Sequence, residues 1–122
     1  MTILIVDDSR IMRNVVKNCF SLLKIPAQYL EANNGKEALL RLQSQPVNLV
    51  LLDWNMPEMS GIEFLKKVRA IDKFKTLPII MITSEGARYS VIEALKAGAT
   101  DYLVKPLTEK HLKEKVFKII SP

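Results

Sequence analysis

The sequence Leu49-Val50-Leu51-Leu52-Asp53 is an unbroken apolar run of strand length that ends on a carboxylate. A strand that is apolar at successive positions is typical of a parallel sheet that is covered on both faces. Three further segments have the same form, namely Ile3–Asp8 (ILIVDD), Ile79–Thr83 (IIMIT) and Tyr102–Pro106 (YLVKP). The four segments therefore predict one parallel sheet with acidic, hydroxyl and amine side chains at the carboxyl ends of its strands.

Stretches with helical features separate these strands. Helices are expected at Ser9–Lys24 and Thr108–Ile120, and at Gly86–Ala97, where Gly98 ends the helix. Another helix is expected after Asn34, which can cap it with Glu37 three residues on. The capping box Ser60–Glu63 begins a further helix that extends to about Ala70. A weaker strand is expected at Ala27–Ala32. Five strands, each followed by a helix, predict an α/β fold with a five-stranded parallel sheet in a three-layer α/β/α sandwich.

Length and composition fit one globular domain. The chain has 122 residues, of which 48% are apolar and 25% charged, and no apolar run approaches the roughly 18 residues of a membrane helix. The N-terminus enters a strand directly, so we expect no signal peptide and no membrane partner. The single cysteine, Cys19, lies in an apolar stripe with Val15 and Val16, which indicates a buried thiol. Without a disulfide framework, a cytoplasmic location is expected.

The chain is basic, with a net charge of +5 and a pI of about 9.4. Such a balance raises nucleic acid as a possible partner. The lysines are dispersed, however, and the one dense run, Lys110–Lys115, is interrupted by Glu114. The sequence contains no helix-turn-helix pattern, zinc-ligand spacing or aromatic RNA motif, so we expect a solvated surface and no nucleic acid partner. His111 stands alone in this run and is expected to be exposed.

Three acids are expected to meet at the carboxyl edge of the sheet, which is where open α/β sheets bind ligands. Asp7 and Asp8 follow the first strand, and Asp53 ends the third. Carboxylates ~5 Å apart repel by roughly 3 kcal/mol per pair at an effective dielectric constant near 20. A cation must compensate this repulsion, and Mg²⁺ is the natural choice because it prefers oxygen ligands. The backbone carbonyl of Asn55, two residues beyond Asp53, can supply a further ligand.

Asp53 follows the most apolar strand and can attack phosphorus as a nucleophile to form an acyl phosphate. Phosphoryl transfer depends mainly on positioning and on charge neutralisation. The Lys105 ammonium and the Thr83 hydroxyl would contact the phosphoryl oxygens. Taken singly, each residue has a simpler interpretation: Asp8 or Ser9 as a helix cap, Thr83 as a strand-end hydroxyl, and Lys105 as a surface lysine. Their joint placement after four strands favours the phosphoryl site.

The residues that carry these features resemble a known family over the full length of the chain. The matching motifs are Val6–Ser9 (VDDS), Leu52–Pro57 (LDWNMP), Ile82–Ser84 (ITS), Gly98–Ala99 (GA) and Val104–Pro106 (VKP). The sequence is similar to the response-regulator receiver domains of two-component signalling. The resemblance implies the flavodoxin-like, CheY-like strand order 2-1-3-4-5 and a single receiver domain over residues 1–122 without an effector domain. It also implies a cis peptide bond before Pro106.

The same resemblance implies a function. A receiver takes a phosphoryl group from a histidine kinase on Asp53, with Mg²⁺ held by Asp7, Asp8, Asp53 and the Asn55 carbonyl. It promotes its own phosphorylation and dephosphorylation but is not a conventional enzyme. In this family Thr83 and Tyr102 would act as the switch, although the Tyr102 ring could equally be a static surface residue.

The residues Trp54, Asn55, Glu85 and Tyr102 resemble those of the stand-alone chemotaxis regulators within the family. This likeness implies a monomer that binds an output target such as a flagellar motor switch protein, and it leaves room for a phosphatase partner. Asn55 and Glu85 would set the lifetime of the phosphate.

Three other functions remain open on the sequence. The chain could be a phosphorelay shuttle, or a receiver domain excised from a larger response regulator. It could also be a phosphatase of the haloacid-dehalogenase type, which uses an aspartate nucleophile with Mg²⁺. That class places its nucleophile after the first strand with a second aspartate two residues on, whereas Asn55 holds that position here. A flavodoxin-like nucleotide binder is disfavoured because the first loop carries two acids and no glycine.

Overall fold

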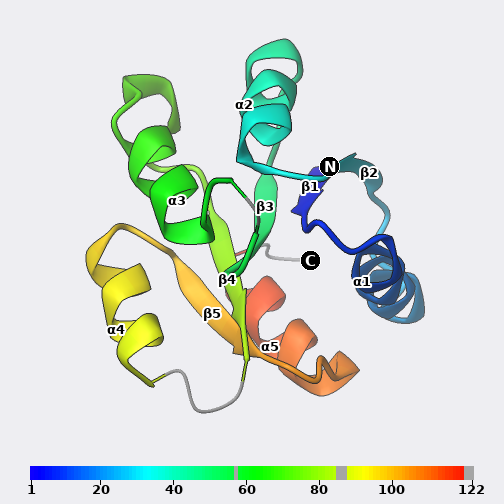
Figure 1. Cartoon of the computed structure of the whole chain (residues 1–122). Helices are drawn as coiled ribbons and strands as arrows, with labels where there is room; N and C mark the ends of the chain where they lie inside the picture. The colour runs from blue at the N-terminus through cyan, green and yellow to red at the C-terminus, as the bar shows by residue number, and fades with distance from the viewer. Residues whose placement is uncertain (57, 85–87, 120–122) are drawn as a thin grey trace.

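The computed structural model describes residues 1–56, 58–84 and 88–119, and strands and helices alternate through these ranges (Figure 1). The strands are β1 (Thr2–Val6), β2 (Gln28–Ala32), β3 (Leu49–Asp53), β4 (Ile79–Thr83) and β5 (Asp101–Val104). The helices are α1 (Arg10–Leu22), α2 (Gly35–Ser44), α3 (Gly61–Arg69), α4 (Arg88–Lys96) and α5 (Glu109–Ile119), with a 3-10 turn η1 (Asp72–Phe74) before β4. None of the helices in these ranges is long and apolar enough to cross a membrane.

The five strands form one parallel sheet in the order β2-β1-β3-β4-β5. Helices cover both faces, α1 and α5 on one side and α2, α3 and α4 on the other (Figure 1). Every residue of β3 and β4 is buried, which explains why their sequences are apolar at successive positions. The structure thus confirms the predicted three-layer α/β/α fold and its strand order.

Side-chain caps fix where three of the helices begin. Ser9 caps α1 by accepting a hydrogen bond from the Met12 N–H at 3.3 Å. Asn34 and Ser60 cap α2 and α3 in the same way, as the sequence predicted. A serine or asparagine oxygen stabilises a helix here because the first amide groups of a helix lack partners within it. The starts of three helices are therefore encoded locally.

The element boundaries differ from the sequence predictions in a few places. β5 is Asp101–Val104 rather than Tyr102–Pro106, because the chain turns away from the sheet at Lys105 and Pro106. The peptide bond between these two residues is cis, as predicted. Helix α1 ends at Leu22, and Gly98 follows α4 with a φ of 110° that suits glycine. Gly86 and Ile120, at expected helix ends, lie outside the described residues.

The buried stripe of α1 contains the predicted Val16 and Cys19 but also a charged residue that apolar spacing did not predict. The buried residues are Arg13, Val16, Cys19 and Phe20, whereas Ile11 is 77% exposed. Residues two positions apart lie on nearly opposite sides of a helix, so a stripe that includes Arg13 turns Ile11 toward solvent. Burial of Cys19 is confirmed, but the helix also places a charged side chain against the sheet.

Candidate functional site

The carboxyl ends of four strands bring the predicted site residues to one edge of the sheet. Asp7 follows β1, Asp53 ends β3, Thr83 ends β4 and Lys105 follows β5. Carboxylate oxygens of Asp7, Asp8 and Asp53 all lie within 4.8 Å of one another. This arrangement follows from parallel topology, because parallel strands end at the same edge.

Two of the three acids are buried. Asp7 and Asp53 each expose only 4% of their surface, whereas Asp8 is exposed. Among the described residues, these three form the one group of acids, histidines or cysteines close enough to share a metal ion. The site therefore has a closed inner side, made by Asp7 and Asp53, and an open side at Asp8.

Lys105 supplies the positive charge at this edge. Its Nζ lies 3.0 Å from the Oδ1 of Asp53, and its backbone N–H donates to the Thr83 carbonyl at 2.8 Å. The backbone bond continues the β4–β5 pairing one residue beyond β5, and the side chain then extends across the strand ends to Asp53. The ion pair consequently joins residues that are 52 positions apart in the sequence.

The electrostatics of the cluster are unbalanced without a further cation. Burial raises the pKa of Asp7 to about 6, and the negative charge of Asp53 also raises it. The Ser9 N–H, which donates to the Asp7 Oδ1 at 2.8 Å, lowers this pKa. Burial also raises the pKa of Asp53, against the lowering effect of Lys105. Three carboxylates face one ammonium, so a divalent cation would neutralise the excess negative charge.

The donor set fits a hard cation. The three side chains offer only carboxylate oxygens, and Mg²⁺ binds through a few such oxygens together with water. The exposed position of Asp8 leaves space for water on that side. The residues present are thus compatible with Mg²⁺, in agreement with the chemistry expected from the sequence.

The remaining predicted residues that the structure describes differ in their burial and contacts. Thr83 is buried, and its hydroxyl makes a single long contact within the described residues, 3.5 Å to the Ser84 carbonyl. Asn55 is exposed just beyond β3. Tyr102 lies on β5, opposite Met81 of β4, and its ring is 4.8 Å from the Nζ of Lys115. Glu85 lies outside the described residues, and His111 is exposed as expected.

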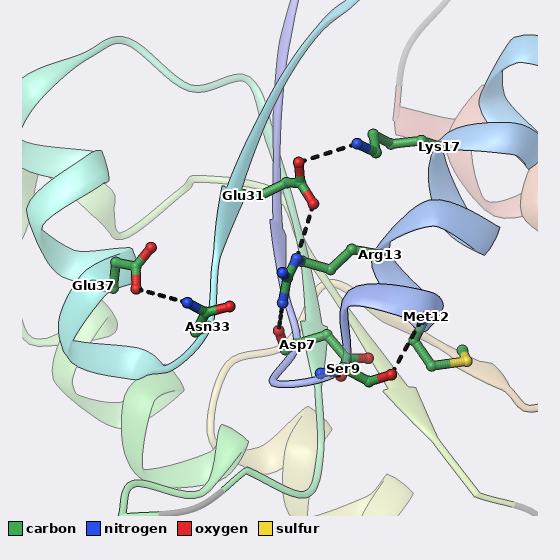
Figure 2. Close-up of polar contacts among 8 residues, drawn as sticks. All are labelled: Asp7, Ser9, Met12, Arg13, Lys17, Glu31, Asn33 and Glu37. Atoms are coloured by element: carbon green, nitrogen blue, oxygen red, sulfur yellow. Dashed lines mark hydrogen bonds and ion pairs between the residues drawn. The ribbon is translucent and has the colours of Figure 1, made fainter.

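One residue beside the cluster was missed by the sequence reading. The guanidinium of Arg13 donates from Nη1 to the Asp7 carbonyl at 2.6 Å and from Nε to Glu31 Oε1 at 2.8 Å (Figure 2). Hydrophobic periodicity predicts the buried face of a helix from its apolar residues alone, so it does not detect a buried arginine. The sequence did contain one signal: Arg13 lies three positions before Val16, and residues with this spacing share one face of a helix.

Comparisons with known proteins agree with the fold. Residues 3–117 match the family model described as the response regulator receiver domain. The chain is 51% identical to the chemotaxis protein CheY1 of Helicobacter pylori strain J99, covering 99% of this chain and 98% of that protein. It is 47% identical to a CheY homolog of Campylobacter jejuni, covering 99% and 93% respectively.

Solved structures extend the likeness to three dimensions. The structure of the chemotaxis response regulator CheY4 of Vibrio cholerae superposes with a TM-score of 0.87 at 33% identity, over 98% of each chain. Similarity in sequence and in fold therefore covers nearly the whole chain.

Proposed function

The chain belongs to the family of response regulator receiver domains, and we propose on this premise that it is a switch that accepts a phosphoryl group on Asp53. It is a CheY-like receiver and not a classical enzyme. The observation that carries the proposal is the buried Asp53 carboxylate, 3.0 Å from the Lys105 ammonium and beside two further acids. Such a carboxylate is shielded from bulk water and is held next to a group that can neutralise phosphoryl charge.

The phosphoryl donor is a phosphohistidine on a histidine kinase. A carboxylate oxygen of Asp53 attacks phosphorus, the new O–P bond forms as the P–N bond breaks, and the imidazole nitrogen keeps the bonding electrons and takes up a proton. Lys105 and the Thr83 hydroxyl then contact phosphoryl oxygens. Asp7, Asp8, Asp53 and the Asn55 carbonyl would hold Mg²⁺, which supplies charge neutralisation when bound.

Acetyl phosphate tests the acceptor directly. Incubation of the protein with acetyl phosphate and Mg²⁺ should add one phosphate that hydroxylamine removes, because hydroxylamine cleaves acyl phosphates. Asp53→Asn should abolish the labelling, while Lys105→Gln should retain the acceptor and slow its modification. Labelling of Asp53→Asn at the wild-type level would show that another residue accepts the phosphate.

The output of the switch is a change in partner binding. We infer that phosphorylation shifts Thr83 and Tyr102 and so alters the surface of β5 and α5, which binds a chemotaxis target such as a flagellar motor switch protein. The protein would act as a cytoplasmic monomer, and a phosphatase is a further possible partner. Pull-down with acetyl phosphate-treated protein, with Asp53→Asn as the control, would identify targets that depend on the phosphate.

Asn55 and Glu85 would set the lifetime of the phosphate. Each lies two residues beyond a site residue, Asn55 after Asp53 and Glu85 after Thr83. From there, each side chain could meet the path of an attacking water without being needed for phosphorylation. Substitution of either should change the dephosphorylation rate more than the phosphorylation rate, and about 1.4 kcal/mol in that barrier is already tenfold in lifetime.

A further inference from the structure

Arg13 joins three parts of the molecule beside the acid cluster. It lies on α1, where it is only 8% exposed, and it contacts both the residue after β1 and a residue of β2 (Figure 2). Its Nη1 donates to the Asp7 carbonyl and its Nε to Glu31. A buried guanidinium with two fixed partners has little freedom to move, so it can transmit the position of β2 to the site.

The main chain of Asp7 is held on both sides. Its N–H donates to the Ala32 carbonyl at 3.1 Å, and its own carbonyl accepts from Arg13 at 2.6 Å. The Asp7 side chain in turn accepts the Ser9 N–H at 2.8 Å. Arg13 is thus one of the contacts that decide where the Asp7 carboxylate lies, although it does not touch that carboxylate.

Glu31 keeps Arg13 in place. One carboxylate oxygen of Glu31 binds Arg13, and the other binds the Nζ of Lys17 at 3.0 Å (Figure 2). These two cations lower the pKa of Glu31, Lys17 more than Arg13, so the acid stays ionised at neutral pH. Lys17 shares the partner of Arg13 but makes no contact with Asp7 among the described hydrogen bonds, which makes it a matched control.

We propose that Arg13 is a positioning residue for the acid pair Asp7 and Asp8, and that it raises the affinity of the site for Mg²⁺ by fixing the main chain of Asp7. The inference rests on the metal site of the proposed function. Partners that orient metal ligands without touching the metal typically change affinity by about 10- to 100-fold when they are replaced.

The sign of the effect separates positioning from simple charge. A positive group near the acids repels a cation, so removal of the Arg13 charge alone would tighten Mg²⁺ binding. Loss of positioning would weaken it. Arg13→Lys keeps the charge but cannot reproduce the two-pronged geometry of a guanidinium, so it isolates the positioning effect.

The test measures Mg²⁺ affinity by calorimetry and by Trp54 fluorescence on the wild type, Arg13→Gln, Arg13→Lys and Lys17→Gln. We expect both Arg13 variants to bind Mg²⁺ about tenfold more weakly or worse, and Lys17→Gln to bind at least as well as the wild type. Melting temperatures in chelator establish that each variant is folded at the assay temperature. A loss of global stability alone does not alter the affinity of the folded fraction.

Unchanged or tighter Mg²⁺ binding in folded Arg13→Gln and Arg13→Lys would overturn the proposal, as would an equal loss in Lys17→Gln. A readout without metal accompanies these titrations: in chelator, the Ser9 amide should exchange hydrogen about tenfold faster in Arg13→Gln, because its acceptor on Asp7 is less fixed. If the wild type itself binds no Mg²⁺, the metal site of the proposed function fails. If the wild type binds Mg²⁺ and the Arg13 variants bind it with the same affinity, the metal site stands and this inference alone fails.

Discussion

At the residue scale, the site depends on where a few charges lie relative to water. Asp7 and Asp53 are buried while Asp8 is exposed, and Lys105 compensates only one of the three acids directly. Without a metal ion the site therefore holds like charges close together, and a bound cation would relieve their repulsion.

The raised pKa of Asp7 leads to a pH dependence of stability in the absence of metal. Its folded-state pKa is about 6 against an ordinary value of 3.8, so between these values the native protein holds a proton that the unfolded chain has lost. Stability from this group is thus highest below about pH 4 and falls as pH rises to about 6. In chelator, Asp7→Asn should stabilise the protein at pH 7.5 by on the order of 2 kcal/mol, seen as a rise of several degrees in melting temperature.

The same substitution should have no stabilising effect at pH 4, where Asp7 is already neutral. Asp8→Asn serves as the control, and its exposed carboxylate should give a smaller gain at pH 7.5. A stabilisation by Asp7→Asn that is as large at pH 4 as at pH 7.5 would contradict the assignment of the cost to an ionised Asp7.

The sequence predicted most residues of the cluster but not their surroundings. Asp7, Asp53 and Lys105 could be identified because they follow apolar strands, and parallel topology brings strand ends together. Arg13 could not, because its burial depends on the rotation of α1 about its axis, which is set by packing against the sheet. Apolar spacing identified Val16 and Cys19 of the buried stripe but gave no sign of Arg13.

At the element scale, local signals determined boundaries where a cap or a glycine was present. The caps Asn34 and Ser60 marked the starts of α2 and α3. The edge strand β2 gave a weaker signal because it is only partly buried, and the prediction was one residue too long. The turn η1 was not predicted, since a single 3-10 turn has no periodicity to detect.

Helix α3 approaches β3 so closely that only glycine fits at the contact. A Cβ on Gly61 would collide with the Asp53 carbonyl and would lie 3.0 Å from Met81 and 3.1 Å from the Trp54 Cα. Gly61→Ala should destabilise the protein by about 1–3 kcal/mol. It should also slow labelling by acetyl phosphate, by about tenfold or more, since small displacements of reacting groups are costly. Denaturant unfolding and labelling kinetics measure both effects.

Gly35→Ala provides the matched control in α2. The added Cβ would meet chiefly the thioether of Met59, a flexible side chain that can move aside, rather than backbone. We expect a change in stability of less than about 1 kcal/mol, because the gain from replacing glycine in a helix offsets the contact. Equal effects of the two substitutions on labelling would mean that the approach of α3 does not position Asp53.

At the scale of the whole molecule, the proposed acceptor and the proposed output surface lie on different strands of one sheet. Asp53 ends β3, and Tyr102 lies on β5 with the intervening strand β4 between them. Lys115 of α5 binds Asp101 at 2.9 Å and packs over the Tyr102 ring. Two routes therefore connect Asp53 with Tyr102. One passes through Thr83 of β4, and the other through Lys105, which pairs with Asp53 and lies three residues beyond Tyr102.

We expect Tyr102→Ala to uncouple output from modification. Labelling by acetyl phosphate and the subsequent loss of phosphate should stay within about twofold of the wild type, because the Tyr102 side chain makes none of the hydrogen bonds or ion pairs described for Asp7, Asp53 or Lys105. Phosphate-dependent target binding should fall about tenfold, or about 1.4 kcal/mol. Tyr102→Phe is the control, because it keeps the ring that packs under Lys115. A strong change in phosphate lifetime in Tyr102→Ala, with target binding intact, would reverse the proposed roles.

The strand order has a consequence for the protein during its synthesis. Lys105 follows β5, the last strand to leave the ribosome, whereas Asp7, Asp8 and Asp53 are translated well before it. Chains grow at about 5–20 residues per second, so a nascent chain carries the three acids for seconds before their ammonium partner emerges. Prematurely terminated products would keep the acids and lack the lysine. A product that ends before Lys105 would thus hold the three acids without the ammonium that pairs with Asp53, and we expect its modification by acetyl phosphate to be slow.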